Sequence, residues 1–378
     1  MENKVRLAID LLWVKPKNVG GAETVIRTLL DEFSKIPSEY QFILLLSRDN
    51  ESSFEKYKKC KNFEMKICNT NTLPLGKRLL WQNISLNKIL VECNTDNYFC
   101  PVYIRPLVRL RKKKSIIVVH DLQQLHYPEY FTKLRYLWCK YSWKRNIALS
   151  DHVVTISEFC KNDIIKNYHT KSDKISVIYN PIASAEIFSD FDLLASKYQI
   201  KSNAYFYTIL SPLKHKNLIT LLKVANKKVN QDGERSFKLL ISGISGGITN
   251  EICEYISKNN LQNNCIMTGY VSDEERNSLI KNCKLFLFPS VFEGFGMPVI
   301  EAMQLGKGVI TTKCTSIPEI SHNKAIYVNN PYDVDEWIKN IEECSLNKTY
   351  QKIVFEEYNA SYSAHIYLSL FSKIYRNI

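Results

Sequence analysis

The sequence predicts an α/β fold with two doubly wound, Rossmann-like parallel-sheet domains that face a cleft. Its 378 residues suggest about two domains, because a domain usually has about 100–200 residues. Short apolar runs rich in Val, Ile, Phe and Tyr alternate with amphipathic stretches along most of the chain. Strands that alternate with helices imply right-handed crossovers and parallel sheets covered on both faces. Ligands bind such sheets beyond the carboxyl ends of the strands.

The predicted strands fall into two series. The first series comprises Val5–Asp10, Gln41–Leu46, Phe63–Ile67, Ser115–Val119, His152–Ile156 and Lys174–Ile178. The second series comprises Ala204–Leu210, Phe237–Ser242, Cys265–Met267, Leu285–Phe288, Val309–Thr312 and Ala325–Val328. Between them, Asn180-Pro181 is a turn signal, and the chain is polar and irregular to about Ser202. We therefore expect a first domain at residues 1–180 and a second at residues 181–355.

The end of the chain, residues 356–378, has a helical pattern. Apolar residues recur there at every fourth position, namely Tyr358, Tyr362, Ile366, Leu370 and Ile374. No predicted strand follows, so this helix either caps its own domain or crosses back to the first domain. We expect the second arrangement, in which the helix crosses back to the first domain.

The composition excludes several protein classes. Hydrophobic residues make up 45% of the chain, which excludes a disordered or collagen-like protein. No apolar run approaches the ~18 residues that span a bilayer, and the first residues do not resemble a signal peptide. The eleven cysteines include no C-x-x-C pair, which favours reduced thiols over disulfides or a zinc site. We expect a cytoplasmic protein.

The formal net charge of +13 allows several interpretations. It can simply follow from a chain rich in Lys, Asn and Ile. It can also favour binding to an anionic membrane surface, an anionic substrate or a nucleic acid. Charge alone does not decide among these.

The most informative segment reads LFLFPSVFEGFGMPVIEAM and runs from Leu285 to Met303. A buried strand is followed by a loop with Glu293 and two glycines, and then by a helix that carries Glu301. Gly296 lets backbone N–H groups approach a ligand, and Pro298 suits the first position of a helix whose N-terminus favours an anion. Two carboxylates beside such a helix suit a ligand with phosphates and hydroxyls. An ordinary βα turn with surface glutamates is the alternative.

This segment resembles the signature of the retaining family 4 glycosyltransferases, which have the GT-B fold. In particular, the chain is similar to the subset that builds surface polysaccharides, such as lipopolysaccharide and capsule. The resemblance covers almost the whole chain, in segments that occur in the family's order. These are Gly20-Gly21-Ala-Glu23, Val119-His120-Asp121-Leu122, His126–Phe131, Ile156-Ser157-Glu158, Tyr179-Asn180-Pro181, Tyr207–Asn217 and Thr268–Asp273.

The resemblance implies a role for each matching residue. Glu293 would accept hydrogen bonds from the donor sugar and steady positive charge near its anomeric carbon. Glu301 would hold the nucleotide ribose, and Lys216 would neutralise the departing diphosphate. His120 would face the reacting centre from the first domain. The other residues implied in donor binding are Gly296, Met297 and Pro298 in the sugar pocket, Gly21, Ser211 and Asn217.

One position departs from the family pattern. Many relatives place an Arg five residues before the Lys, where this chain has Ser211. Lys214 or a basic residue of the first domain can compensate. We otherwise expect Lys214 and His215 to face solvent.

The resemblance implies a nucleotide-sugar donor, a glycan or lipid-linked glycan acceptor, and retention of anomeric configuration. No Asp-x-Asp lies beside a predicted nucleotide site, which fits a mechanism without metal or cofactor in which Lys216 and a helix N-terminus stabilise the leaving group.

Basic residues of the first domain add a membrane hypothesis. They form the run Arg109–Lys114, and they mix with Trp and Tyr over Lys133–Arg145. A solvated basic face is the simpler interpretation, but basic-aromatic surfaces also suit an anionic bilayer. We predict a peripheral protein on the inner face of the cytoplasmic membrane.

Other functions remain open on the sequence alone. A nucleotide-sugar epimerase or a phosphorylase can share this fold, and Ser211 allows a non-catalytic partner subunit. A dinucleotide-dependent oxidoreductase is disfavoured because no G-x-G-x-x-G follows the first strand. Nucleic-acid binding is disfavoured because no binding module is recognisable.

Overall fold

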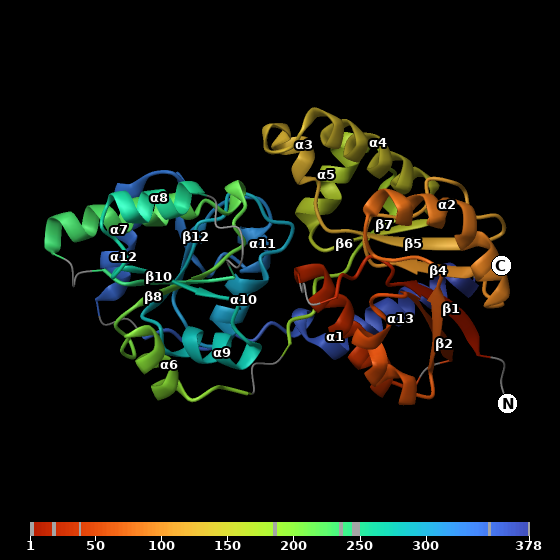
Figure 1. Cartoon of the computed structure of the whole chain (residues 1–378), viewed down its shortest axis with the longest axis horizontal. Coiled ribbons are helices and arrows are strands. Elements are labelled where there is room, and N and C mark those ends of the chain that lie inside the picture. The colour runs from red at the N-terminus through yellow and green to blue at the C-terminus, as the bar shows by residue number, and fades with distance from the viewer. Residues whose placement is uncertain are drawn as a thin grey trace. The chain divides into compact units, whose positions relative to one another are not determined.

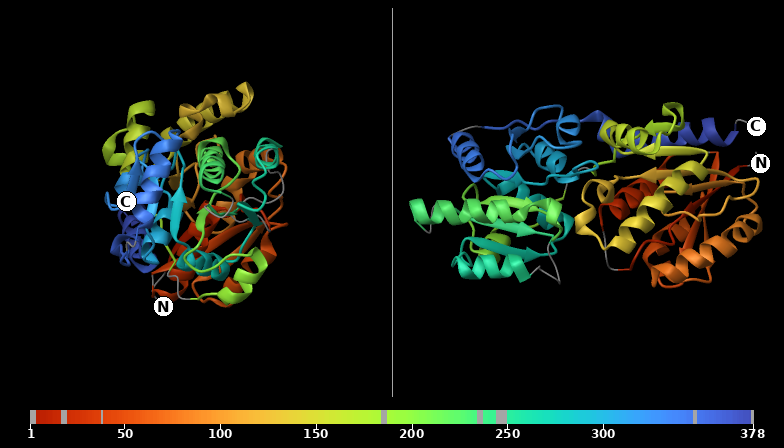
Figure 2. Two further views of the ribbon diagram at one scale, coloured as in Figure 1. Left: turned by 90° about the vertical axis from the view of Figure 1, so that its left-hand side faces the viewer. Right: turned by 90° about the horizontal axis from the view of Figure 1, so that it is seen from above.

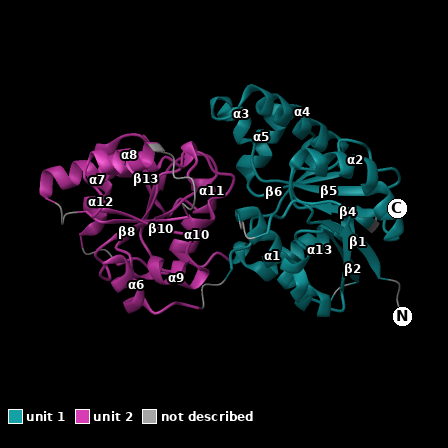
Figure 3. Ribbon diagram, in the orientation of Figure 1, with its two compact units in different colours: residues 1–183, 356–378 teal, residues 184–355 magenta. Residues whose placement is uncertain are grey.

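The computed structural model describes residues 4–16, 20–37, 39–183, 187–233, 237–243, 250–346 and 349–376. The chain divides into two compact units (Figure 3). Unit 1 comprises Met1–Ala183 and Glu356–Ile378, and unit 2 comprises Ser184–Phe355. Each unit is a parallel sheet with helices on both faces (Figure 1), which confirms the prediction of two doubly wound, Rossmann-like domains.

Unit 1 is built on a seven-stranded sheet with the order β3-β2-β1-β4-β5-β6-β7. Its strands are β1 Val5–Asp10, β2 Tyr40–Ser47, β3 Phe63–Cys68, β4 Asn97–Cys100, β5 Lys114–Val119, β6 His152–Thr155 and β7 Ile175–Val177. Its α-helices are α1 Gly21–Lys35, α2 Leu75–Glu92, α3 Gln123–His126, α4 Lys133–Leu149, α5 Glu158–Tyr168 and α13 Ala360–Arg376. Short 3₁₀ segments lie at Glu51–Lys59, Pro128–Tyr130, Ser172–Lys174 and Glu356–Tyr358.

The predicted strands omitted β4, although it lies in the middle of this sheet. It has only four residues, with sequence NYFC, too few to show a clear apolar run. Its side chains alternate between the two faces of the sheet. Tyr98 belongs to the core beneath α2 and α4, whereas the Phe99 ring lies 5.1 Å from that of Phe371 on α13.

Helix α13 completes unit 1 (Figure 2). Its Phe371 packs 6.2 Å from Phe33 of α1, and the Tyr375 hydroxyl donates to the Tyr98 carbonyl at 2.8 Å. The helix begins at Ala360 rather than at 356, because the Asn359 side chain accepts hydrogen bonds from the first-turn N–H groups of Ser361 and Tyr362.

The predicted apolar stripe of this helix was partly wrong. Tyr362 is 51% exposed, whereas the buried side chains are Ser363, Ala364, Tyr367, Leu370, Phe371 and Tyr375. A helix has 3.6 residues per turn, so a strict spacing of four rotates by ~40° at each step and leaves the buried face.

Unit 2 is built on a six-stranded sheet with the order β10-β9-β8-β11-β12-β13. Its strands are β8 Phe206–Ile209, β9 Leu239–Ser242, β10 Cys265–Gly269, β11 Leu285–Phe288, β12 Val309–Thr312 and β13 Ile326–Val328. Its α-helices are α6 Phe191–Tyr198, α7 Leu218–Asp232, α8 Asn250–Lys258, α9 Asp273–Asn282, α10 Met297–Gln304, α11 Ile317–Ile320 and α12 Val334–Ser345, and a 3₁₀ turn lies at Lys214–Lys216. Strand β11 is fully buried and pairs with both β8 and β12. None of the helices described in either unit is both long enough and apolar enough to cross a bilayer.

The packing of α13 predicts the effect of truncating Phe371. Phe371→Ala leaves a cavity between α1, β4 and α13, and should lower the free energy of unfolding of unit 1 by about 3–5 kcal/mol. Urea unfolding followed by tryptophan fluorescence measures this. Tyr362→Ala is the matched control on the exposed face of the same helix, with an expected effect within about 0.5 kcal/mol. Equal effects of the two substitutions would contradict the docking of α13 through Phe371.

Candidate active site

An ion pair joins two loops at the carboxyl edge of the second sheet. Lys216 follows β8, and Glu293 follows β11, which is the neighbouring strand. Lys216 Nζ lies 2.6 Å from Glu293 Oε1, and the two side chains are 19% and 11% exposed. A half-buried pair of this kind holds both charged groups where water is largely excluded, so each side chain is oriented before a ligand arrives.

The Glu293 loop is anchored by the segment that follows β12. The Thr315 hydroxyl accepts a hydrogen bond from the Glu293 N–H at 3.0 Å. The Ser316 hydroxyl lies 3.0 Å from the carbonyls of both Glu293 and Phe295. The loop ends at Gly296, whose φ of +100° is a conformation that L-residues with a side chain rarely adopt. This glycine therefore allows the chain to turn directly into α10.

Helix α10 begins at Met297, with Gly296 as its N-cap and no side-chain cap. Pro298 is its second residue rather than its first, and both Met297 and Pro298 are partly exposed. The uncapped first turn presents its positive end beside the Glu293 loop, which suits an anionic ligand group.

Glu301 lies on α10 and meets an arginine that the sequence analysis did not single out. Arg276 Nη2 of α9 lies 3.7 Å from Glu301 Oε1, and Arg276 Nη1 donates to Asp273 at 2.7 Å. Burial raises the pKa of Glu301, the positive charge of Arg276 partly offsets this, and Asp273 raises it further. Arg276 therefore favours the ionised form of Glu301, which can accept two ribose hydrogen bonds.

The signal for Arg276 was present in the motif Thr268–Asp273. Ser272 caps α9 in a capping box with Glu275, which sets the start of this helix after β10. Arg276 then lies one turn into α9, but its pairing with Glu301 depends on the tertiary placement of α9 beside α10.

Asn217 and His215, the two sequence neighbours of Lys216, fix the position of its turn through hydrogen bonds. The Asn217 amide donates to the carbonyls of Pro289 and Pro331 at 3.3 and 3.0 Å, so its side chain holds the Lys216 turn to the end of β11. His215 is only 6% exposed, which corrects the expectation that it faces solvent, and its carbonyl accepts from Val291 N–H at 2.8 Å. Burial, with the charge of Lys216, lowers the pKa of His215 to about 4, so the ring is neutral near pH 7.

Ser211 lies just after β8, partly exposed, and Lys214 is exposed on the turn that carries Lys216. Arg276 is a further cation close to one of the predicted donor residues, Glu301. Compensation for Ser211 by Lys214 or by a basic residue of the first domain stays a prediction.

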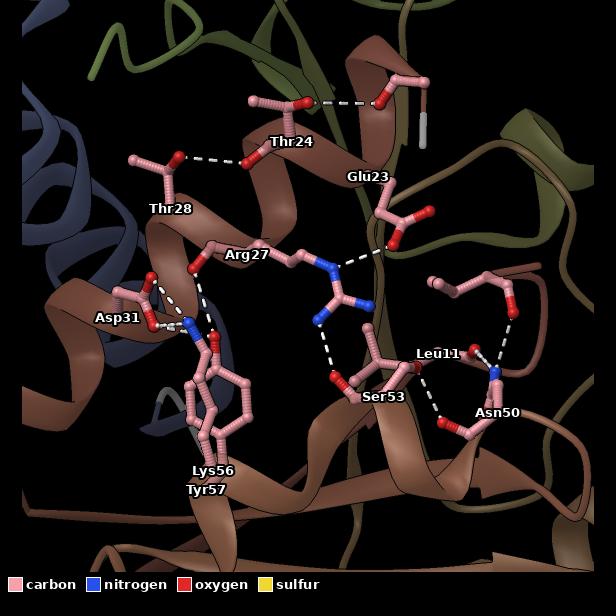
Figure 4. Close-up of polar contacts among 12 residues, drawn as sticks. Leu11, Glu23, Thr24, Arg27, Thr28, Asp31, Asn50, Ser53, Lys56 and Tyr57 are labelled. Atoms are coloured by element: carbon pink, nitrogen blue, oxygen red, sulfur yellow. Dashed lines mark hydrogen bonds and ion pairs between the residues drawn. The ribbon is translucent and has the colours of Figure 1, made fainter. Parts of the chain in front are cut away.

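Gly21 belongs to unit 1 and lies at the first turn of α1. A side chain added at Gly21 would meet nothing within 4 Å, so the first turn of α1 has space beside it. Figure 4 shows how this turn is held: Glu23 accepts a hydrogen bond from Arg27, which also donates to the Ser53 carbonyl. The two distances are 2.8 and 2.9 Å, and Glu23 is only 4% exposed. The same view shows Asn50, whose amide donates to the Leu11 carbonyl of the preceding loop.

His120 lies directly after β5, at the carboxyl edge of the first sheet as predicted. Its Nε2 lies 2.9 Å from the Pro101 carbonyl. A carbonyl only accepts, so Nε2 carries the proton and Nδ1 carries the lone pair of the neutral ring. Burial lowers the pKa of His120, although the Pro101 hydrogen bond and Asp121 raise it, so the neutral ring can accept a hydrogen bond from a hydroxyl near pH 7.

The structure thus brings Lys216 and Glu293 into contact, and it places Gly296, Met297 and Pro298 in the turn between Glu293 and Glu301. His120 and Gly21 belong to unit 1. Among the described residues, no group of three His, Cys, Asp or Glu side chains is arranged to hold a metal ion. The chemistry that the unit 2 residues themselves offer is a fixed cation, a helix N-terminus and two carboxylates, which suits a hydroxyl-rich diphosphate ligand.

Two family profiles match consecutive parts of the chain. Glycosyltransferase Family 4 matches residues 19–186, and Glycosyl transferases group 1 matches residues 190–359. The O-antigen chain mannosyltransferase RfbU of Salmonella typhimurium is 29% identical over 284 residues, which are 73% of this chain and 74% of that protein. The O-antigen chain mannosyltransferase B of Escherichia coli is 27% identical over 232 residues, which are 60% of this chain and 59% of that protein.

A solved structure supports the same fold. The crystal structure of a glycosyltransferase from Rickettsia africae superposes with a TM-score of 0.70 at 19% identity, and the match covers 100% of both chains. The family profiles together span nearly the whole sequence, and the two sheets have the expected architecture. The chain therefore belongs to the family 4, group 1 glycosyltransferases of the GT-B fold.

Proposed function

We propose that this glycosyltransferase moves mannose from a nucleotide sugar, such as GDP-mannose, to a growing lipid-linked glycan of a surface polysaccharide. The observation that carries the proposal is the Lys216–Glu293 ion pair beside the uncapped start of α10. The choice of mannose rests on the two relatives, both of which are O-antigen chain mannosyltransferases.

The proposed reaction exchanges one bond at the anomeric carbon for another. The bond from this carbon to the diphosphate oxygen breaks, and its electron pair leaves with the diphosphate. A hydroxyl oxygen of the acceptor bonds to the same carbon, and its proton passes to the leaving phosphate oxygen. If both events occur on one face of the sugar, the anomeric configuration is retained and no strong base is needed.

Each site residue has a defined part in this reaction. Lys216 and the start of α10 stabilise the negative charge that grows on the diphosphate. Glu293 steadies the positive charge on the sugar ring and accepts hydrogen bonds from its hydroxyls. Glu301, which lies beside Arg276, holds the ribose by accepting hydrogen bonds from its hydroxyls. His120 of unit 1 accepts a hydrogen bond from a sugar or acceptor hydroxyl through Nδ1.

The donor proposal is tested by a panel of nucleotide sugars in a thermal-shift assay. GDP-mannose should stabilise the protein most, by about 2.7 kcal/mol at a hundredfold excess over its dissociation constant. EDTA should leave this shift and mannosyl transfer unchanged, because the proposed mechanism uses no metal. A larger shift with a UDP- or dTDP-sugar would overturn the mannose assignment, and loss of transfer in EDTA would overturn the metal-free mechanism.

Substitution of Lys216 separates stabilisation of the transition state from donor binding. Lys216→Ala should lower kcat by about a hundredfold or more, while KM for the donor changes much less, since negative charge grows as the bond breaks. Steady-state kinetics measure both constants. Lys223→Ala removes an exposed lysine from α7, the helix that follows the Lys216 turn, and should retain kcat. A Lys216→Ala defect confined to KM would mean that Lys216 only binds the donor.

We also propose that unit 1 docks on an anionic bilayer, where a lipid-linked acceptor would be found. One face of α4 exposes Leu134, Leu137, Trp138 and Tyr141, at the i, i+3, i+4 and i+7 spacing of a single stripe. Exposed basic residues flank this stripe, namely Lys133, Arg135, Lys140, Lys144 and Arg145. Apolar and aromatic side chains can enter the interface, and each basic residue near it contributes ~1 kcal/mol.

Vesicle sedimentation tests the α4 surface. The protein should sediment with vesicles that contain phosphatidylglycerol, and the bound fraction should fall as salt rises. Leu134→Ser with Trp138→Ser should release it, whereas Leu193→Ser with Tyr332→Ser, exposed residues of unit 2, should not. Binding that is indifferent to the α4 substitutions would exclude docking through this helix.

A further inference from the structure

A cavity lies at the opposite edge of the first sheet from His120. Its volume is 310 Å³, and it is lined by Arg105, Arg109, Leu110, Lys112, Lys113, Lys114, Ser115, Leu149 and Asp151. Lys114 and Ser115 begin β5, whereas His120 follows the end of that strand. From Lys114 to His120 the chain makes six steps of about 3.3 Å, which separate the two places by roughly 20 Å. The cavity is therefore not part of the candidate active site.

The charges around the cavity are strongly unbalanced. Five of its lining residues are cations, whereas Asp151 is its one carboxylate. Asp151 Oδ2 already accepts the Ser115 N–H at 2.7 Å and lies 3.0 Å from the Ser115 hydroxyl. Lys113 pairs with Asp96 at 2.5 Å, outside the lining, so part of the positive charge is compensated there.

Arg105 is the buried member of this group. It is 1% exposed, and its Nη1 lies 3.1 Å from the Ser115 hydroxyl and 3.3 Å from the Ser150 hydroxyl. Its Nη2 lies 3.4 Å from the Val108 carbonyl, and its Nε has no hydrogen-bond partner among the described residues. All of these recorded partners are uncharged. Burial lowers the pKa of Arg105, because a charged guanidinium loses its hydration there and no carboxylate is in contact with it.

Only part of the basic run is a solvated face: Arg109, Arg111 and Lys112 are exposed, whereas Lys113 and Lys114 are partly buried. The Lys113 side chain is 7% exposed, and Lys114 Nζ donates to the Ile374 carbonyl of α13 at 2.9 Å. Lys112 has a φ of +53°, in the left-handed region, where the turn reverses the chain between Leu110 and Lys114. The run therefore folds around the cavity instead of lying flat on the surface.

We propose that this cavity is a binding site for a phosphate group, held by Arg105, Arg109 and Lys112. An arginine presents planar N–H groups that match phosphate oxygens, and an anion in contact would offset the burial of the Arg105 charge. The volume equals that of roughly ten water molecules, so a phosphate with an attached glycerol fits as well as a free phosphate. A phospholipid headgroup and a soluble phosphate share this chemistry, and the experiment below distinguishes them.

The test measures binding by the full-length protein and does not depend on sugar transfer, so it can fail while the proposed function stands. Isothermal titration calorimetry with inorganic phosphate measures whether the cavity binds a soluble phosphate. Sedimentation with phosphatidylcholine vesicles that contain phosphatidic acid, which carries a phosphate monoester, covers the lipid source. Both are repeated with Arg109→Ser/Lys112→Ser, two exposed positions at the cavity rim, which leaves the buried Arg105 and its hydrogen bonds intact.

The matched control is Lys59→Ser/Lys61→Ser, which removes the same charge from two exposed positions elsewhere in unit 1. We expect at least one of the two probes to bind the wild-type protein, and to bind Arg109→Ser/Lys112→Ser about tenfold more weakly while the control retains affinity. Binding of inorganic phosphate identifies a soluble ligand, and binding of the vesicles alone identifies a headgroup. Equal losses in both variants, or no binding of either probe by the wild-type protein, would overturn the proposal.

Discussion

The ion pair between Lys216 and Glu293 is the interaction on which the candidate site depends. The two residues are far apart in the sequence but follow neighbouring strands of one parallel sheet, so their loops meet at the same edge. Either charge alone would be costly in a half-buried position. Paired, the lysine and the glutamate are held ready for a ligand whose diphosphate needs a cation and whose sugar needs a hydrogen-bond acceptor.

Much of the surrounding structure maintains this pair. Asn217 ties the lysine turn to the end of β11, while Thr315 and Ser316 hold the glutamate loop from the segment after β12. The positive φ of Gly296 then directs the chain into α10, whose first turn and Glu301 belong to the proposed donor site. Arg276 lies beside Glu301, and its positive charge partly offsets the rise in the pKa of Glu301 that burial causes.

The sequence allowed prediction of features that depend on local pattern. Apolar runs such as Leu285–Phe288 predicted the strands. The glycines and the proline after Glu293 predicted the loop and the start of α10 to within a residue or two. Features that depend on tertiary contacts were missed. Strand β4 is too short to show the two-residue alternation of a strand. Arg276 meets Glu301 only because α9 packs beside α10. His215 is buried against the loop after β11, although its neighbours in the sequence are lysines. Nothing in the sequence indicated that the basic run Arg109–Lys114 lines a cavity, because this depends on the turn at Lys112 and on the packing of Arg105 and Asp151.

A double-mutant cycle tests the central claim that Lys216 and Glu293 act as one unit. The measured quantity is kcat/KM for mannosyl transfer by Lys216→Ala, Glu293→Ala and the double variant. If the pair acts as a unit, the double variant should lose little more than the worse single variant, with a coupling energy of about 1 kcal/mol or more. Losses that add to within about 0.5 kcal/mol would show that the two residues act independently, and would contradict the account.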